Sequence, residues 1–180
     1  MNSFYSAFLG FALIFLVGMK SKECIHPVPA VGRQEVIAVD GVAEFLVNTA
    51  HLNLMALKEG EEAIRKGTIE DIKAYGELMV RDKTNLLAEI RQLALARQVT
   101  LPEKLSEDNA RSLEKLKSKS GVAFNKAFVK SIHCAHKQAL KDFKKAASKL
   151  EDKEVSSFAS KYINTINLQI IRIEKIKEKM

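Results

Sequence analysis

The stretch that most constrains the fold is residues 68–98, which carry the pattern of one long amphipathic helix. Apolar side chains recur mostly at steps of three and four residues, at Ile69, Ile72, Tyr75, Met79, Leu86, Ile90 and Leu93. This spacing predicts a helix with one buried face. Asp82 interrupts the apolar positions between Met79 and Leu86. Because burying an unpaired carboxylate is very costly, we expect Asp82 to be paired, hydrogen-bonded or protonated.

Three more long helices and one short helix are predicted from the rest of the chain. The first covers residues 40–66 and ends at Gly67, and Thr68 is expected to cap the second helix, with Asp71 in the capping-box position. Pro102 and its neighbours break the pattern before a short helix at 107–117. The third long helix is predicted over 122–149, and the last follows an acidic break at 151–152.

Two tight connections and one long one define the predicted topology. Short loops make the helices of each pair antiparallel neighbours, and the long link crosses the bundle. Glycine and proline are scarce and tryptophan is absent, as expected for an all-helical protein. The sequence therefore predicts an all-α, ferritin-like four-helix bundle over residues 40–180, with one long crossover that contains the short helix.

The amino-terminal residues 1–23 are predicted to be a signal peptide or an N-terminal membrane anchor. Residues 1–19 contain no charged side chain, and residues 4–17 are almost continuously apolar. Residues 24–39, with Pro27, Pro29 and Gly32, are predicted to be a linker. We therefore expect an exported protein, either periplasmic or anchored to the membrane and facing the periplasm. We expect no disulfide between Cys24, in the linker, and Cys134, in a helix.

The net charge of +7 comes mostly from lysines spread through the helices. Such a surface is typical of a soluble protein, and attraction to an anionic membrane or envelope polymer is the alternative. Basic and aromatic residues are not interleaved as they are where bases stack, so the sequence argues against nucleic acid as a partner.

Polar residues near the middle of each long helix predict a polar belt across the bundle core. Asp82 and His136 lie close to the midpoints of their helices, and Asn53 and Gln169 are the nearest equivalents in the other two. The favoured interpretation is a buried Asp82–His136 pair whose hydrogen bonds the two amides complete. Breaking such a pair is expected to cost about 3–5 kcal/mol.

The alternative interpretation is a metal site formed by Asp82 and His136, with His133 as a third candidate ligand. Only the first two residues are good ligands, because His133 lies beside the apolar face. A di-iron bundle needs several inward carboxylates and Glu-x-x-His pairs. The only such pair, Glu23 and His26, lies in the predicted linker.

The sequence does not support catalysis. It contains no Gly-rich phosphate loop and no dinucleotide fingerprint. Cys134 follows His133 directly, and adjacent residues on a helix point in different directions, which argues against a Cys–His nucleophile. We expect no cofactor, with a metal ion as the alternative.

Several motifs resemble a family of bacterial exported proteins catalogued as domain of unknown function 4142. Their order along the chain is Gly60-x-x-Ala63, Met79-Val80-Arg81-Asp82, Leu101-Pro102, Gly121-Val122-Ala123-Phe124 and then His136. The resemblance covers residues 45–176. It implies a ferritin-like helical bundle, export, and no established activity.

The chain departs from this family at most of its candidate ligands. Lys83 and Gln169 stand where the family typically has histidines, Ala56 stands in place of a glutamate, and Asn125 in place of an aspartate. The resemblance therefore implies that this protein retains only Asp82 and His136 of that pattern.

These observations favour an exported, non-catalytic helical bundle with a structural or interaction role in the bacterial envelope, where its partner is unknown. Two alternatives remain. One is a metal-binding or stress-related bundle that uses Asp82 and His136. The other is lysine-mediated binding to an anionic membrane or an envelope polymer.

Overall fold

The computed structural model describes residues 41–180, which form five helices. They are α1 (Gly41–Lys66), α2 (Glu70–Ala96), α3 (Glu107–Lys117), α4 (Gly121–Lys149) and α5 (Lys153–Glu178). No strand occurs in this part of the chain, so the predicted all-α fold is confirmed. The predicted signal peptide or anchor and the linker lie outside the described residues.

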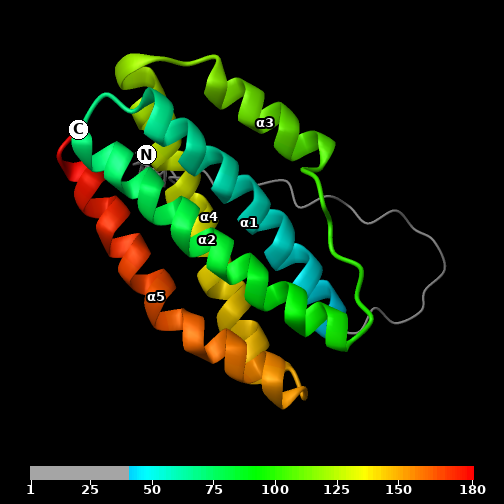
Figure 1. Ribbon diagram of the computed structural model, residues 1–180. Helices are drawn as coiled ribbons and strands as arrows, with labels where there is room; N and C mark the ends of the chain where they lie inside the picture. The colour runs from blue at the N-terminus through cyan, green and yellow to red at the C-terminus, as the bar shows by residue number, and fades with distance from the viewer. Residues whose placement is uncertain (1–40) are drawn as a thin grey trace, which may run out of the picture.

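Four long helices lie side by side, and α3 lies outside them along α1 (Figure 1). Helix α1 packs against α2, and α4 packs against α5. The long connection 97–120 returns the chain to the end of the bundle where α2 began, so α2 and α4 run in the same direction. This is the predicted arrangement with one long crossover.

Helices α1 and α2 approach closely where two glycines face each other. A Cβ atom built on Gly76 would lie 2.7 Å from the carbonyl oxygen of Gly60, and one built on Gly60 would lie 3.1 Å from the carbonyl oxygen of Gly76. Any larger side chain at Gly76 would therefore push the two helices apart. The Gly60-x-x-Ala63 motif owes its small residues to this contact, since Ala63 lies 3.0 Å from the Cβ built on Gly76.

The predicted cap of α2 is wrong. The residue before α2 is Ile69, which makes no side-chain cap hydrogen bond. Thr68 instead binds α4: its hydroxyl accepts from Asn125 Nδ2 at 2.6 Å, and its N–H donates to Asn125 Oδ1 at 3.2 Å. The side-chain amide of Asn125 therefore holds the turn between α1 and α2 against the beginning of α4.

Helix α5 begins at a capping residue that also joins two helices. Asp152 accepts hydrogen bonds from the N–H groups of Glu154 and Val155. Its carboxylate also accepts from Arg97 Nε at 2.6 Å and Nη2 at 2.8 Å. Arg97 and the backbone bonds hold the pKa of Asp152 down to about 2. The acidic break in the sequence therefore connects the end of α2 to the start of α5.

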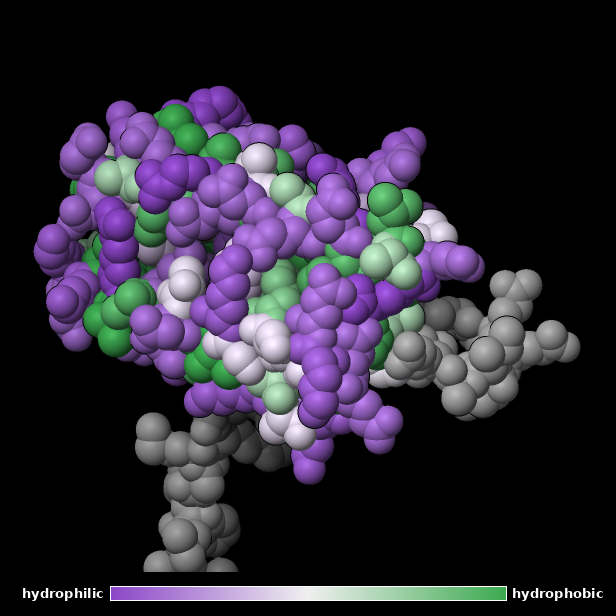
Figure 2. Space-filling view, turned by 60° about the horizontal axis from the view of Figure 1, so that its bottom comes forward, coloured by the Kyte–Doolittle hydropathy of each residue, from purple (hydrophilic) through white to green (hydrophobic). Residues whose placement is uncertain are grey.

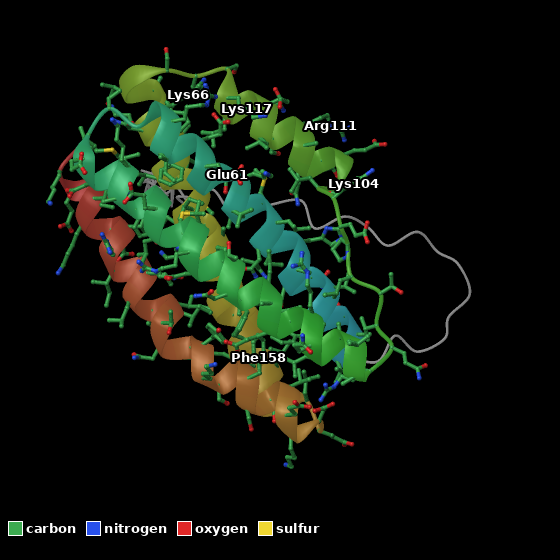
Figure 3. The ribbon with its side chains drawn as sticks, in the orientation of Figure 1. Glu61, Lys66, Lys104, Arg111, Lys117 and Phe158 are labelled. Carbon is green, nitrogen blue, oxygen red and sulfur yellow. The ribbon has the colours of Figure 1, made fainter. Side chains whose placement is uncertain are left out.

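Helix α3 is held at its carboxyl end by a lysine from α1. The Lys66 ammonium donates to the carbonyl oxygens of Lys117 and Lys119, and Figure 3 shows Lys66 beside Lys117. A cation at a helix C-terminus is favourable because the last carbonyls lack partners within the helix. Helix α3 also has two buried leucines, Leu113 and Leu116.

The core consists of two apolar clusters. One contains Phe45, Phe143 and Phe158, and the other contains Phe124 and Phe128. The view in Figure 2 shows a mostly hydrophilic surface in which apolar side chains form small patches. No helix within residues 41–180 has the length and hydropathy needed to cross a membrane.

Candidate functional site

A layer of polar side chains lies between the two apolar clusters, where the sequence predicted a polar belt. Each long helix contributes to it, and we define this polar layer as Asn53, Tyr75, Lys83, His136 and Gln169. All five residues are buried. The polar belt is therefore present, although its hydrogen bonds differ from those predicted.

The centre of the polar layer is a hydrogen bond between Tyr75 and His136. The Tyr75 hydroxyl lies 2.7 Å from His136 Nε2 and donates to the backbone carbonyl of Gln169 at 3.2 Å. The Tyr75 hydroxyl of α2 therefore contacts both the His136 imidazole of α4 and the backbone of α5.

Burial and nearby positive charge both favour a neutral imidazole at His136. His136 is 2% exposed, and burial followed by the charges of Lys83 and His133 holds its pKa well below the usual value. Burial and the Asp82 charge likewise raise the pKa of Tyr75, against the opposing charge of Arg172. Both groups are uncharged at neutral pH, as their positions in the core require.

Asp82 forms no direct hydrogen bond with His136 in the described structure, contrary to the favoured interpretation of the sequence. Its Oδ2 accepts from Gln169 Nε2 at 3.0 Å, and its Oδ1 contacts Arg81 Nε at 3.4 Å. The Asp82 side chain is 27% exposed. The carboxylate is thus linked to His136 only through Gln169 and Tyr75, and it lies at the edge of the core.

The residue buried at this point of α2 is Lys83, which is 7% exposed. Its ammonium makes no hydrogen bond or ion pair with residues 41–180. Burial lowers the pKa of Lys83 to about 8, against the opposing effect of the Asp82 charge. A largely buried cation without a partner among residues 41–180 is costly, and Lys83 is the charged side chain of the polar layer.

Lys83 lines two adjoining spaces. The inner one is a cavity of about 20 Å³ that it shares with Asn53 and His136. This volume has room for about one water molecule. The outer one is a groove of about 160 Å³ between α2 and α5, lined also by Asp82, Tyr162 and Thr165, among others. Lys83 therefore stands between the interior of the bundle and its surface.

Two amide oxygens in the polar layer lack hydrogen-bond partners among the described residues. Asn53 donates from Nδ2 to the carbonyl of Thr49 at 2.7 Å, which leaves its Oδ1 unpartnered. Gln169 donates to Asp82, which leaves its Oε1 unpartnered. The polar layer therefore has unused acceptors near the buried amine.

The three candidate metal ligands have different hydrogen-bond partners in the structure. His133 Nε2 contacts Glu174 Oε1 of α5 at 2.9 Å, whereas His136 binds Tyr75 and Asp82 binds Gln169. No group of three or more His, Cys, Asp or Glu residues in the described part of the chain is arranged to hold a metal ion.

Cys134 is disulfide-bonded, which contradicts the expectation of no disulfide for this residue. Cys24, the other cysteine of the chain, lies outside the described residues.

Sequence reasoning missed three of the buried polar groups. Tyr75 was counted as part of an apolar face, and its hydroxyl gave no separate signal. Lys83 could have been found, because the family resemblance places a histidine at its position. Glu59 is 1% exposed, accepts a hydrogen bond from Ser131, and its pKa is raised to about 7 by burial. Its neighbours Gly60 and Glu61 gave no sign that Glu59 faces inward.

The outer side of α4 carries a second polar feature, a row of exposed lysines. Five of them share one side of the helix at spacings of three, four and seven residues, and we call them the lysine row: Lys126, Lys130, Lys137, Lys141 and Lys144. None of the five forms an ion pair with residues 41–180. Asp142 is the only carboxylate of α4. The lysine row spans about 27 Å.

Comparison with known proteins identifies a family for the chain. The model of the family described as "Domain of unknown function (DUF4142)" matches residues 29–176, which is most of the chain. No curated protein and no solved structure matches the chain significantly. The chain therefore belongs to the DUF4142 family, whose function is unknown.

Proposed function

We propose that the protein is a non-catalytic interaction module of the bacterial envelope, which binds an anionic membrane surface through the lysine row of α4. The observation that carries this proposal is the alignment of five exposed lysines on one helix with no ion pair to neutralise them. The sequence alone indicated only that lysines are spread through the helices.

Electrostatics supports a broad, weak contact of this kind. Each lysine near an anionic membrane surface contributes about 1 kcal/mol of attraction. Because the lysines of the row form no ion pair within residues 41–180, no intramolecular ion pair has to break on binding. The rigid helix places the five charges on one side, so they can meet a flat surface together.

Phospholipid headgroups fit this surface better than a nucleic acid or a sugar polymer. Chain-like polyanions are commonly held in grooves by aromatic side chains as well as by charge. The aromatic residues of α4 are Phe124, Phe128 and Phe143, and all three are buried in the core. The lysine row therefore offers charge without a stacking platform.

The experiment is co-sedimentation of the full-length chain with lipid vesicles. We expect binding to vesicles that contain phosphatidylglycerol, no binding to pure phosphatidylcholine, and release at about 1 M salt, where the screening length falls to about 3 Å. Binding that persists at this salt concentration would contradict an electrostatic contact. Tighter binding to a soluble anionic polysaccharide than to vesicles would contradict the choice of lipid.

A matched pair of variants locates the contact. In the first, Lys126, Lys130, Lys137 and Lys141 are each changed to Gln. In the second, the same change is made at four exposed lysines elsewhere: Lys73, Lys104, Lys115 and Lys175. Both variants lose the same net charge. We expect the first to lose at least about tenfold in vesicle affinity and the second to lose much less. Equal losses would mean that net charge, and not the lysine row, drives binding.

Export is the part of the proposal that rests on the amino-terminal sequence. Residues 1–19 lack charged side chains and are followed by Lys20 and Lys22. We expect the full-length chain to fractionate with the periplasm or the membrane, and a chain without residues 1–23 to remain in the cytoplasm. The same distribution for both chains would contradict export by this segment.

A further inference from the structure

We propose that Lys83 is the reactive amine of a second site, which binds a small hydroxyaldehyde in the groove between α2 and α5 as an imine. This site is independent of the lysine row and lies in a different part of the molecule. It would give the bundle a covalent, reversible ligand in addition to its membrane contact.

The position of Lys83 supports a nucleophilic role. Its side chain is buried, has no partner among residues 41–180, and lines the groove from which a small molecule could enter. Burial lowers the pKa of Lys83 to about 8, so a sizeable fraction of the amine is neutral near physiological pH. Surface lysines with ordinary pKa values near 10.4 are almost entirely protonated there. A desolvated lysine is a recognised way to obtain a nucleophilic amine.

The groove lining can hydrogen-bond a small hydroxylated carbonyl compound. Asp82 lines the groove, and the Tyr162 hydroxyl, which also lines it, donates to Glu89 at 2.6 Å. Both carboxylates are already paired with cations, Asp82 with Arg81 and Glu89 with Lys161. The hydroxyl of Thr165 together with the amide of Asn85 can hydrogen-bond the hydroxyl groups of a ligand. The volume of about 160 Å³ suits a compound of two or three carbons.

Imine formation would also relieve the cost of the buried charge. The neutral nitrogen of Lys83 attacks the aldehyde carbon, a C–N bond forms, and the carbonyl oxygen becomes a hydroxyl. Protons from the nitrogen and solvent convert this hydroxyl into water, which leaves as the C=N bond forms. No oxidant or reductant is needed. The neutral imine places no charge at this largely buried position, which favours the adduct over the protonated lysine.

The groups that would assist the proton transfers belong to three helices. Asp82 of α2 and Tyr162 of α5 line the groove, and His136 of α4 lines the inner cavity. Asp82 also raises the pKa of Lys83. Its carboxylate can accept the proton released when the ammonium becomes a neutral amine, as a general base would.

The test is chemical trapping in the full-length chain. Protein is treated with glycolaldehyde and sodium cyanoborohydride at pH 7.5, digested, and analysed by mass spectrometry for modification at each lysine. We expect Lys83 to be modified at least about tenfold faster than the exposed Lys137 and Lys141. This preference should vanish in denaturing urea, where all lysines are equivalent. A rate at Lys83 equal to or below that of the surface lysines would overturn the proposal.

A matched pair of variants tests the route of entry. Thr165→Phe places a ring in the groove, whereas Thr84→Phe makes the same change at an exposed position of α2 outside it. We expect Thr165→Phe to slow modification of Lys83 at least about fivefold at an unchanged melting temperature, and Thr84→Phe to leave it unaltered. Unchanged labelling in folded Thr165→Phe would show that the groove is not the site. If Thr165→Phe does not fold, Thr165→Leu replaces it with the same two outcomes.

Discussion

The polar layer in the core and the lysine row on α4 use the same kind of side chain in opposite ways. Lys83 is buried without a partner, and burial lowers its pKa to about 8. The five lysines of the row are exposed to solvent. A buried polar group changes the stability of the fold, whereas a solvated one changes what the fold binds. Substitutions in the polar layer are therefore expected to change stability more than substitutions in the lysine row.

The largest loss of stability is expected for His136→Ala. The substitution leaves a cavity in the polar layer and removes the imidazole that is hydrogen-bonded to the Tyr75 hydroxyl. We expect the free energy of unfolding to fall by about 3–5 kcal/mol, as measured by urea denaturation. A loss below about 1 kcal/mol would mean that the polar layer does not hold the helices in register.

A gain of stability is expected for Lys83→Met. This change removes a buried ammonium and keeps most of its volume, so we expect a gain of roughly 1–3 kcal/mol at pH 6. The folded pKa of about 8 lies below the ordinary value near 10.4, so the native state binds fewer protons between these pH values. Wild-type stability should therefore rise from pH 8 to about pH 10 relative to that of the variant. A constant difference between them would contradict the lowered pKa.

The smallest change among the substitutions is expected for the fourfold Gln variant of the lysine row. Exposed lysines without partners contribute little to folding, so its free energy of unfolding should stay within about 0.5 kcal/mol of the wild type. Thermal and urea unfolding measure this directly. A large loss would show that these lysines support the fold, and reduced vesicle binding could then no longer be assigned to a lost contact.

No change is expected on addition of metal ions. Asp82, His133 and His136 bind different partners, so we predict that iron, zinc, copper and manganese leave the melting temperature unaltered. A ligand that binds only the native state must stabilise it. A rise in melting temperature with one ion, absent in Asp82→Ala, would therefore restore the metal interpretation of the sequence.

The fold was predictable because apolar periodicity reports which side of each helix is buried. The expected helix bounds agree with the structure to within two residues, and the long crossover followed from loop lengths alone. The polar belt was placed correctly for the same reason: Asn53, His136 and Gln169 interrupt regular apolar patterns and are buried.

The individual contacts were not predictable. Asp82 lies three residues after Met79 and Lys83 lies four after it, so both fit the helical spacing between Met79 and Leu86. The sequence therefore could not decide which of the two faces the core. The Tyr75 hydroxyl was hidden because a tyrosine fits an apolar pattern through its ring. The lysine row was present in the spacing of α4, yet its freedom from ion pairs depends on which carboxylates the neighbouring helices place nearby.

The most direct test of membrane binding by the lysine row is the orientation of the bound protein. A fluorescent label at Ala123 lies on the same side of α4 as Lys126 and Lys130, and a second label at Ala88 lies on the exposed side of α2. Helix α2 lies across the bundle from α4, since both pack against α1 and α5 (Figure 1). With a quencher attached to the headgroups of phosphatidylglycerol vesicles, we predict strong quenching at Ala123 and little at Ala88. Equal quenching, or stronger quenching at Ala88, would contradict the proposal that the lysine row faces the membrane.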